Sequence, residues 1–96
     1  MEVGVFTDMY KVKDGFIVRR IGPQVMAVPT GKMTSEIHGM IALTESAELL
    51  WSALEKGAEP NELVCLLTEH YEIDRDTANT DVKKFLAGLR EQGALE

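Results

Sequence analysis

The stretch GMIALTESAELLWSAL, residues 39–54, decides the fold because its hydrophobic period changes partway along it. Residues 39–43 form a short uninterrupted apolar run, which is typical of a β-strand. After Thr44 the apolar residues recur at the i, i+3, i+4, i+7 spacing of a helix: Ala47, Leu50, Trp51 and Leu54. Thr44 is a favourable N-cap for this helix, and Gly57 is a favourable residue to end it. The stretch therefore predicts a strand that leads directly into an amphipathic helix.

Upstream of this stretch, the sequence has the character of a β-hairpin. Residues 16–21 contain β-branched and aromatic side chains and follow the turn signal Asp14-Gly15. Gly22-Pro23 turns the chain, because Gly tolerates a positive φ and Pro fixes its own φ. Residues 25–28 return as a second strand, and residues 11–13 are expected to add a further strand by pairing across Asp14-Gly15.

Downstream, two more helices are expected. Pro60 suits the first turn of a helix whose inward side chains are Leu63, Val64, Leu67 and Tyr71. Asp74 suits the N-cap of a third helix and Gly93 suits its end. The inward side chains of that third helix are Ala78, Val82, Phe85, Leu86 and Leu89. We therefore predict one α+β domain over residues 1–96, a winged helix-turn-helix-like fold with a three-stranded antiparallel sheet followed by three helices, and with residues 1–10 as a lead-in.

Charge and composition narrow the class of protein. The 96 residues are 45% hydrophobic and 27% charged, which is ordinary for a globular domain and unlike a disordered chain. The net charge of −6 is unevenly distributed: residues 1–34 carry +2 and residues 35–96 carry −8. Phosphate neutralisation supplies most of the affinity of a DNA-binding domain, so this balance disfavours nucleic acid as a partner.

The location expected from the sequence is the cytoplasm. The amino-terminal residues lack the basic and apolar regions of a signal peptide. The longest apolar runs are about five residues, whereas a membrane helix needs about 20. The single cysteine, Cys65, excludes an intrachain disulfide, and its apolar neighbours predict a thiol buried in the core.

The sequence lacks a recognisable catalytic or metal-binding pattern. His38, His70 and Cys65 are the side chains that titrate nearest neutrality, and they do not cluster. The glycines occur singly, so there is no phosphate-binding loop. We therefore expect no catalytic residues, no metal and no cofactor, and a protein that is not an enzyme. A small enzyme or metalloprotein is the least favoured alternative.

Two surfaces are candidates for binding a partner: the basic face of the third helix and the edge of the third strand. Lys83, Lys84 and Arg90 make residues 74–92 a candidate recognition helix, so the alternative function is a winged-helix DNA-binding regulator. Acidic residues share that helix, which favours a solvated mixed-charge face. Residues 39–43 follow a long polar connection at residues 32–38, which places them at the edge of a sheet. No charge or proline protects this edge, so it is either covered core or a template for another strand.

The order and spacing of these segments over residues 16–96 resemble the PqqD family, which includes the chaperone of pyrroloquinoline quinone biosynthesis. The same module is the recognition element of ribosomally made, modified peptides. The residues that carry the resemblance are Phe16-Ile17-Val18-Arg19-Arg20, Val28-Pro29-Thr30-Gly31, Gly39-Met40-Ile41-Ala42-Leu43-Thr44-Glu45, Leu50-Trp51, Glu62-Leu63, Tyr71-Glu72-Ile73-Asp74, Asp81-Val82, Phe85-Leu86, Leu89 and Gly93-Ala94-Leu95-Glu96. Thr44 replaces the usual Asn and Ala94 replaces the usual Leu; Thr also caps a helix, whereas Ala94 removes apolar bulk beside the third helix.

The resemblance implies a non-catalytic adaptor that binds the leader segment of a precursor peptide as an extra antiparallel strand. The groove lies between the third strand and the third helix, and the peptide is presented to a modifying enzyme, often a radical S-adenosylmethionine enzyme. The expected peptide-binding residues are Gly39, Met40, Ile41, Ala42 and Leu43 on the strand with Asp81, Lys84, Phe85 and Gly88 on the helix. The other flank of the helix carries Asn79, Lys83 and Arg90. The same edge also offers a route to a homodimer.

Overall fold

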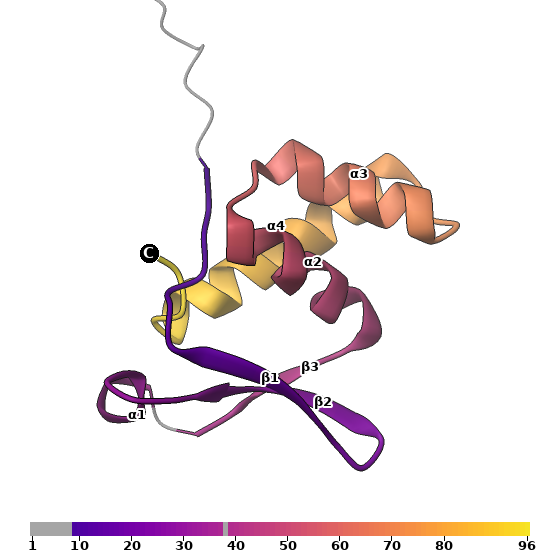
Figure 1. The fold of residues 1–96 in the computed structure, drawn as a ribbon. Helices are drawn as coiled ribbons and strands as arrows, with labels where there is room; N and C mark the ends of the chain where they lie inside the picture. The colour runs from indigo at the N-terminus through magenta and orange to yellow at the C-terminus, as the bar shows by residue number, and fades with distance from the viewer. Residues whose placement is uncertain (1–8, 38) are drawn as a thin grey trace, which may run out of the picture.

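The structure is a computed structural model and describes residues 9–37 and 39–96. The expected α+β architecture is confirmed, with one additional short helix. Helices α2, α3 and α4 lie together on one side of the sheet (Figure 1). None of the described helices combines the length and apolar character that crossing a bilayer requires. In chain order the elements are β1 (Phe16–Ile21), β2 (Gln24–Pro29), α1 (Met33–Glu36), β3 (Ile41–Leu43), α2 (Glu45–Lys56), α3 (Pro60–His70) and α4 (Arg75–Glu91).

The sheet is antiparallel with the order β1-β2-β3, so β3 is an edge strand as expected. Val25 pairs with Leu43 and Ala27 pairs with Ile41. The strand begins at Ile41 rather than at Gly39, whose φ of +88° is incompatible with a continuous strand. The far edge of β3 pairs with no strand in the described part of the chain.

The two faces of the sheet differ because successive strand residues point to opposite sides. Ile41, Leu43 and Ala27 are buried on the face that the helices cover. Ile17 and Met40 are about half exposed, at 50% and 53%, and Ala42 is also exposed. The alternative in which the third strand is covered core is therefore wrong, because the helices cover one face of the sheet. The core forms on one face of the sheet.

The helix termini follow the expected capping pattern. The Thr44 hydroxyl accepts a hydrogen bond from the Ala47 N–H at 3.2 Å, and the Asp74 carboxylate accepts one from the Thr77 N–H at 2.7 Å. At α3, Glu59 and Glu62 form a capping box just before and after Pro60. The apolar stripes that these caps begin meet in the core, although Tyr71 and Phe85 are only partly buried.

The prediction for residues 11–13 is wrong. The segment does not pair with β1; Tyr10 instead forms an isolated bridge with Ala58, and Val12 forms one with Leu95. Val12 is only 4% exposed, because this path buries its side chain against the helices. The burial of an apolar side chain favours this path over pairing across Gly15.

Residues 32–38 are not simply a polar connection. Met33 begins the single turn of α1, and both Met33 and Ile37 are buried. Met33 packs onto Gly15, where any side chain would collide with it. His38 and residues 1–8 lie outside the described residues, so the expectations for them stand untested.

Candidate functional site

The candidate site begins with the edge of β3 that pairs with no strand among residues 9–37 and 39–96. Ile41 and Leu43 are each 6% exposed and point into the core, whereas Met40 and Ala42 are exposed. Gly39 lies before the strand and is exposed. This edge therefore offers a partner the backbone groups of β3, together with the exposed side chains of Ala42 and of Met40 just before the strand.

The expected helix residues form a single stripe on α4. Asp81, Lys84, Phe85 and Gly88 have i, i+3, i+4, i+7 spacing, which places them on one side of a helix. Asp81 and Lys84 are exposed, and Phe85 packs against the core while staying partly exposed. Apart from its chain neighbours and the nearby backbone of its own helix, a Cβ atom added to Gly88 would meet no atom of the described residues within 4 Å. The surface beside Gly88 is therefore open to a partner.

A cavity of about 310 Å³ links the end of β3 to α4. Asp81 on α4 lines it, and so does Thr44, the residue that directly follows β3. Its lining comes from the start of α2, the end of α3, the connection to α4, and α4 itself: Thr44, Glu45, Ser46, Leu67, Tyr71, Ile73 and Asp81. Of the nine site residues expected from the sequence, only Asp81 lines this cavity.

The cavity has an acidic character. Loss of hydration around the Tyr71 hydroxyl raises its pKa above 10.0, and the negative charge of Glu45 raises that pKa further. Tyr71 therefore stays a neutral phenol at physiological pH. Sequence reasoning missed Glu45 and Tyr71 as site residues, because they lie on elements distant in sequence and no local pattern relates them to Asp81.

The opposite flank of α4 faces another part of the molecule. Lys83 and Arg90 line a cavity of about 250 Å³ together with Tyr10 and Pro60. The Arg90 guanidinium lies 5.7 Å from the centre of the Tyr10 ring. Lys84 lies on the Asp81 side instead. The three basic residues of a hypothetical DNA-recognition face are therefore divided between two flanks.

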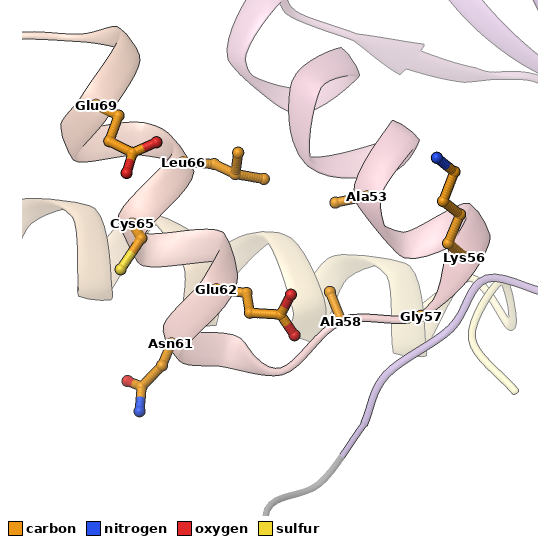
Figure 2. A pocket seen from close by; sticks show the side chains of 9 residues that line it. All are labelled: Ala53, Lys56, Gly57, Ala58, Asn61, Glu62, Cys65, Leu66 and Glu69. Carbon is orange, nitrogen blue, oxygen red and sulfur yellow. The ribbon is translucent and has the colours of Figure 1, made fainter.

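The cavity between α2 and α3 is larger, at about 510 Å³ (Figure 2). Ala53 on α2 and Leu66 on α3 line it, and so does Cys65. Cys65 is exposed, so the prediction of a buried thiol is wrong. Successive helix residues are about 100° apart, and Cys65 lies two positions from both Leu63 and Leu67, which face the core.

The described residues contain no group of three or more His, Cys, Asp or Glu side chains that could hold a metal ion. The His70 Nδ1 lies 2.9 Å from the Leu66 carbonyl oxygen of its own helix. This exposed histidine is therefore engaged with its own helix, one turn back.

Comparison with known proteins identifies a similar solved structure. Among solved structures it is similar to one titled "TbiB1 in Complex with the TbiA(beta) Leader Peptide", with 27% sequence identity and a TM-score of 0.71. The match covers 90% of this chain and 94% of that one. None of the curated proteins matches the chain. Neither this neighbour nor the family match favours the DNA-binding alternative.

The family match agrees with the resemblance seen in the sequence. The sequence model of PqqD, described as coenzyme PQQ synthesis protein D, matches residues 25–95. This region runs from β2 through α4 and includes both β3 and the α4 stripe. Because it takes in well over half of the residues, the chain belongs to the PqqD family.

Proposed function

We propose that this protein is a non-catalytic adaptor that binds the leader segment of a ribosomally made precursor peptide and presents it to a modifying enzyme. The observation that carries the proposal is the edge of β3 that no strand in the described part of the chain pairs with. The open surface at Gly88 on α4 supports it. The similarity over 90% of the chain to a protein solved with a leader peptide supports it.

Strand addition suits the chemistry of this edge. Backbone N–H and C=O groups along Ile41–Leu43 bind any extended peptide, because they do not depend on its sequence. Sequence selectivity comes from side chains of the peptide that alternate toward the groove and away from it. The proposed contacts on the strand are Gly39, Met40, Ile41, Ala42 and Leu43.

The proposed wall of the groove is the stripe of α4 that holds Asp81, Lys84, Phe85 and Gly88. Asp81 supports the choice of this flank, because it shares a cavity with the residue after β3. The Lys83 and Arg90 flank lies against Tyr10 and Pro60 instead. A peptide paired with β3 would therefore meet the Asp81 flank.

The proposed enzyme partner is a radical S-adenosylmethionine enzyme, and the adaptor itself supplies no catalytic group. The β3 edge also offers a second copy of the chain the same backbone groups. A homodimer through this edge would compete with the leader for β3. We therefore expect leader addition to dissociate any such dimer.

The test is a backbone amide titration of isotope-labelled protein with the leader of the small peptide encoded nearest its gene. We expect shifts concentrated on residues 39–43 and on the Asp81–Gly88 stripe. The matched negative control is the same leader in scrambled order. Shifts confined to the α2–α3 cavity around Cys65, or no shifts at saturating peptide, would overturn the proposal.

A further inference from the structure

We propose that the cavity at the end of β3 binds a Lys or Arg side chain of the leader, donated by a residue just N-terminal to the segment that pairs with β3. This inference rests on the proposed function and specifies the chemistry of the same site. It is carried by the lining of the cavity and by the direction of the strand.

The cavity combines an apolar floor with an acidic rim. Leu67 is buried, at 2% exposure, and Ile73 and Tyr71 are partly buried beside it. Glu45 and Asp81 line the same cavity and are exposed. Lys and Arg have an apolar stem and a charged tip, so their stems pack on apolar surface while their tips reach carboxylates.

Electrostatics favour a cation over other occupants. Glu45 is on α2 and Asp81 is on α4, and no basic residue among those that the structure describes lines the cavity with them. Among the described residues, neither carboxylate forms a salt bridge. Lys84 lies about one helical turn from Asp81 and is not part of the lining. An acidic side chain placed in the cavity would therefore meet two like charges.

The direction of strand addition fixes which leader residue reaches the cavity. Thr44 lines the cavity and directly follows β3, so the cavity lies at the carboxyl end of the strand. An antiparallel partner places its amino end there. In Figure 1, α4 lies on the helical side of the sheet and runs in the direction opposite to β3. A peptide leaving the cavity along β3 would then pass Lys84 and Gly88 in that order.

The experiment uses the leader of the small peptide encoded nearest the gene. Each of the three residues before the docked segment is changed in turn to Lys, Gln and Glu, and Kd is measured by calorimetry at low salt. We expect one position where Lys binds about 5-fold more tightly than Gln and Glu binds more weakly still. Added salt should reduce these differences, because it screens exposed charges.

Protein variants identify the carboxylates responsible. In the double variant Glu45→Gln with Asp81→Asn, the preference for Lys should disappear, and Glu45→Gln with Asp81→Lys should reverse it in favour of Glu. The matched control is Glu48→Gln with Asp76→Asn, which removes one charge from the first turn of α2 and one from α4 outside this cavity. The control should keep the preference for Lys.

The outcomes separate the two proposals. Equal binding of the Lys, Gln and Glu peptides at all three positions, with normal leader affinity, would overturn this inference and leave the adaptor function intact. The same holds if the preference survives in the Glu45 and Asp81 double variant. No binding of any leader version would overturn the adaptor function and this inference with it.

Discussion

The ring of Phe16 on β1 meets the ring of Trp51 on α2 edge to face, with ring centroids 5.2 Å apart and an interplanar angle of 82°. Trp51 is 1% exposed, and its indole N–H has no hydrogen-bond partner among the described residues. Apolar and aromatic packing therefore holds this residue in place. The pair joins the sheet to the helices and so helps to fix where β3 lies relative to α4.

Removing one ring of this pair should destabilise the domain. We expect Phe16→Ala to lower the free energy of unfolding by about 2 kcal/mol, because the partly buried ring loses both its packing and its edge-to-face contact. Urea unfolding followed by Trp51 fluorescence measures the change. Ile17→Ala, at an exposed neighbouring position, should change it by less than about 0.5 kcal/mol. Equal effects of the two variants would contradict this role for the pair.

Different substitutions at Gly88 should change the stability of the domain and its affinity for the leader independently. Gly88→Ala should raise the free energy of unfolding by about 0.5–1 kcal/mol, because Ala is the better helix former and its Cβ has free space. Gly88→Trp should weaken leader binding at least about 10-fold by filling the groove. Ala87→Trp, on the flank that faces Tyr10, is the matched control. Comparable loss of binding in both Trp variants would place the peptide elsewhere.

If the leader pairs with β3 through its backbone, the effect of removing a leader N–H on binding should alternate from one residue to the next. Single N-methylation removes one N–H of the peptide without changing the protein. We expect methylation at alternate residues of the docked segment to abolish measurable binding, and methylation at the intervening residues to be tolerated, because only alternate N–H groups face β3. Calorimetry with a series of singly methylated leaders tests this. Uniform sensitivity, or none, would argue against strand addition.

The Asp74 cap makes the stability of α4 dependent on pH. Hydrogen bonds from Thr77 hold the pKa of Asp74 below its usual 3.8. A lowered folded-state pKa contributes stability that is complete above the unfolded-state pKa and is lost as pH falls through the folded-state value. The stability difference between the wild type and Asp74→Asn should therefore be constant at neutral pH and shrink below pH 3.8. Urea unfolding across this range checks it; a difference that grows on acidification would contradict the assignment.

The exposed Cys65 thiol should react in the folded protein. We expect complete labelling by a small thiol reagent without denaturant, as measured by mass spectrometry. Because Cys65 lines the α2–α3 cavity and not the proposed groove, the labelled protein should bind the leader with unchanged Kd. A thiol that reacts only in urea would restore the buried assignment, and loss of leader binding on labelling would move the site to this cavity.

Local chemistry allowed much of the fold to be predicted from the sequence. Thr44, Pro60 and Asp74 begin helices where expected, because caps depend on short-range hydrogen bonds. The edge position of β3 was also predictable, since a long connection at residues 32–38 precedes the strand. The path of residues 11–13 was not, because it depends on contacts of Val12 with the distant Leu95.

The same distinction between local pattern and long-range packing applies to the residues of the candidate site. The stripe from Asp81 to Gly88 follows from helical periodicity alone. The position of Glu45 and Tyr71 beside Asp81 depends on how α2, α3 and α4 pack, and no spacing in the sequence encodes that. Cys65 was misplaced for a local reason: apolar neighbours in sequence do not share a helix face with it.

If the leader pairs with β3 as proposed, the shortness of β3 limits how long the leader stays bound. A strand of three residues offers few backbone groups to a partner, and each hydrogen bond contributes a net of only about 1 kcal/mol. Such an edge supports a short residence time rather than permanent capture. A carrier that must release its cargo to an enzyme, and then accept another, benefits from this weakness. The three-residue edge would therefore favour turnover over storage.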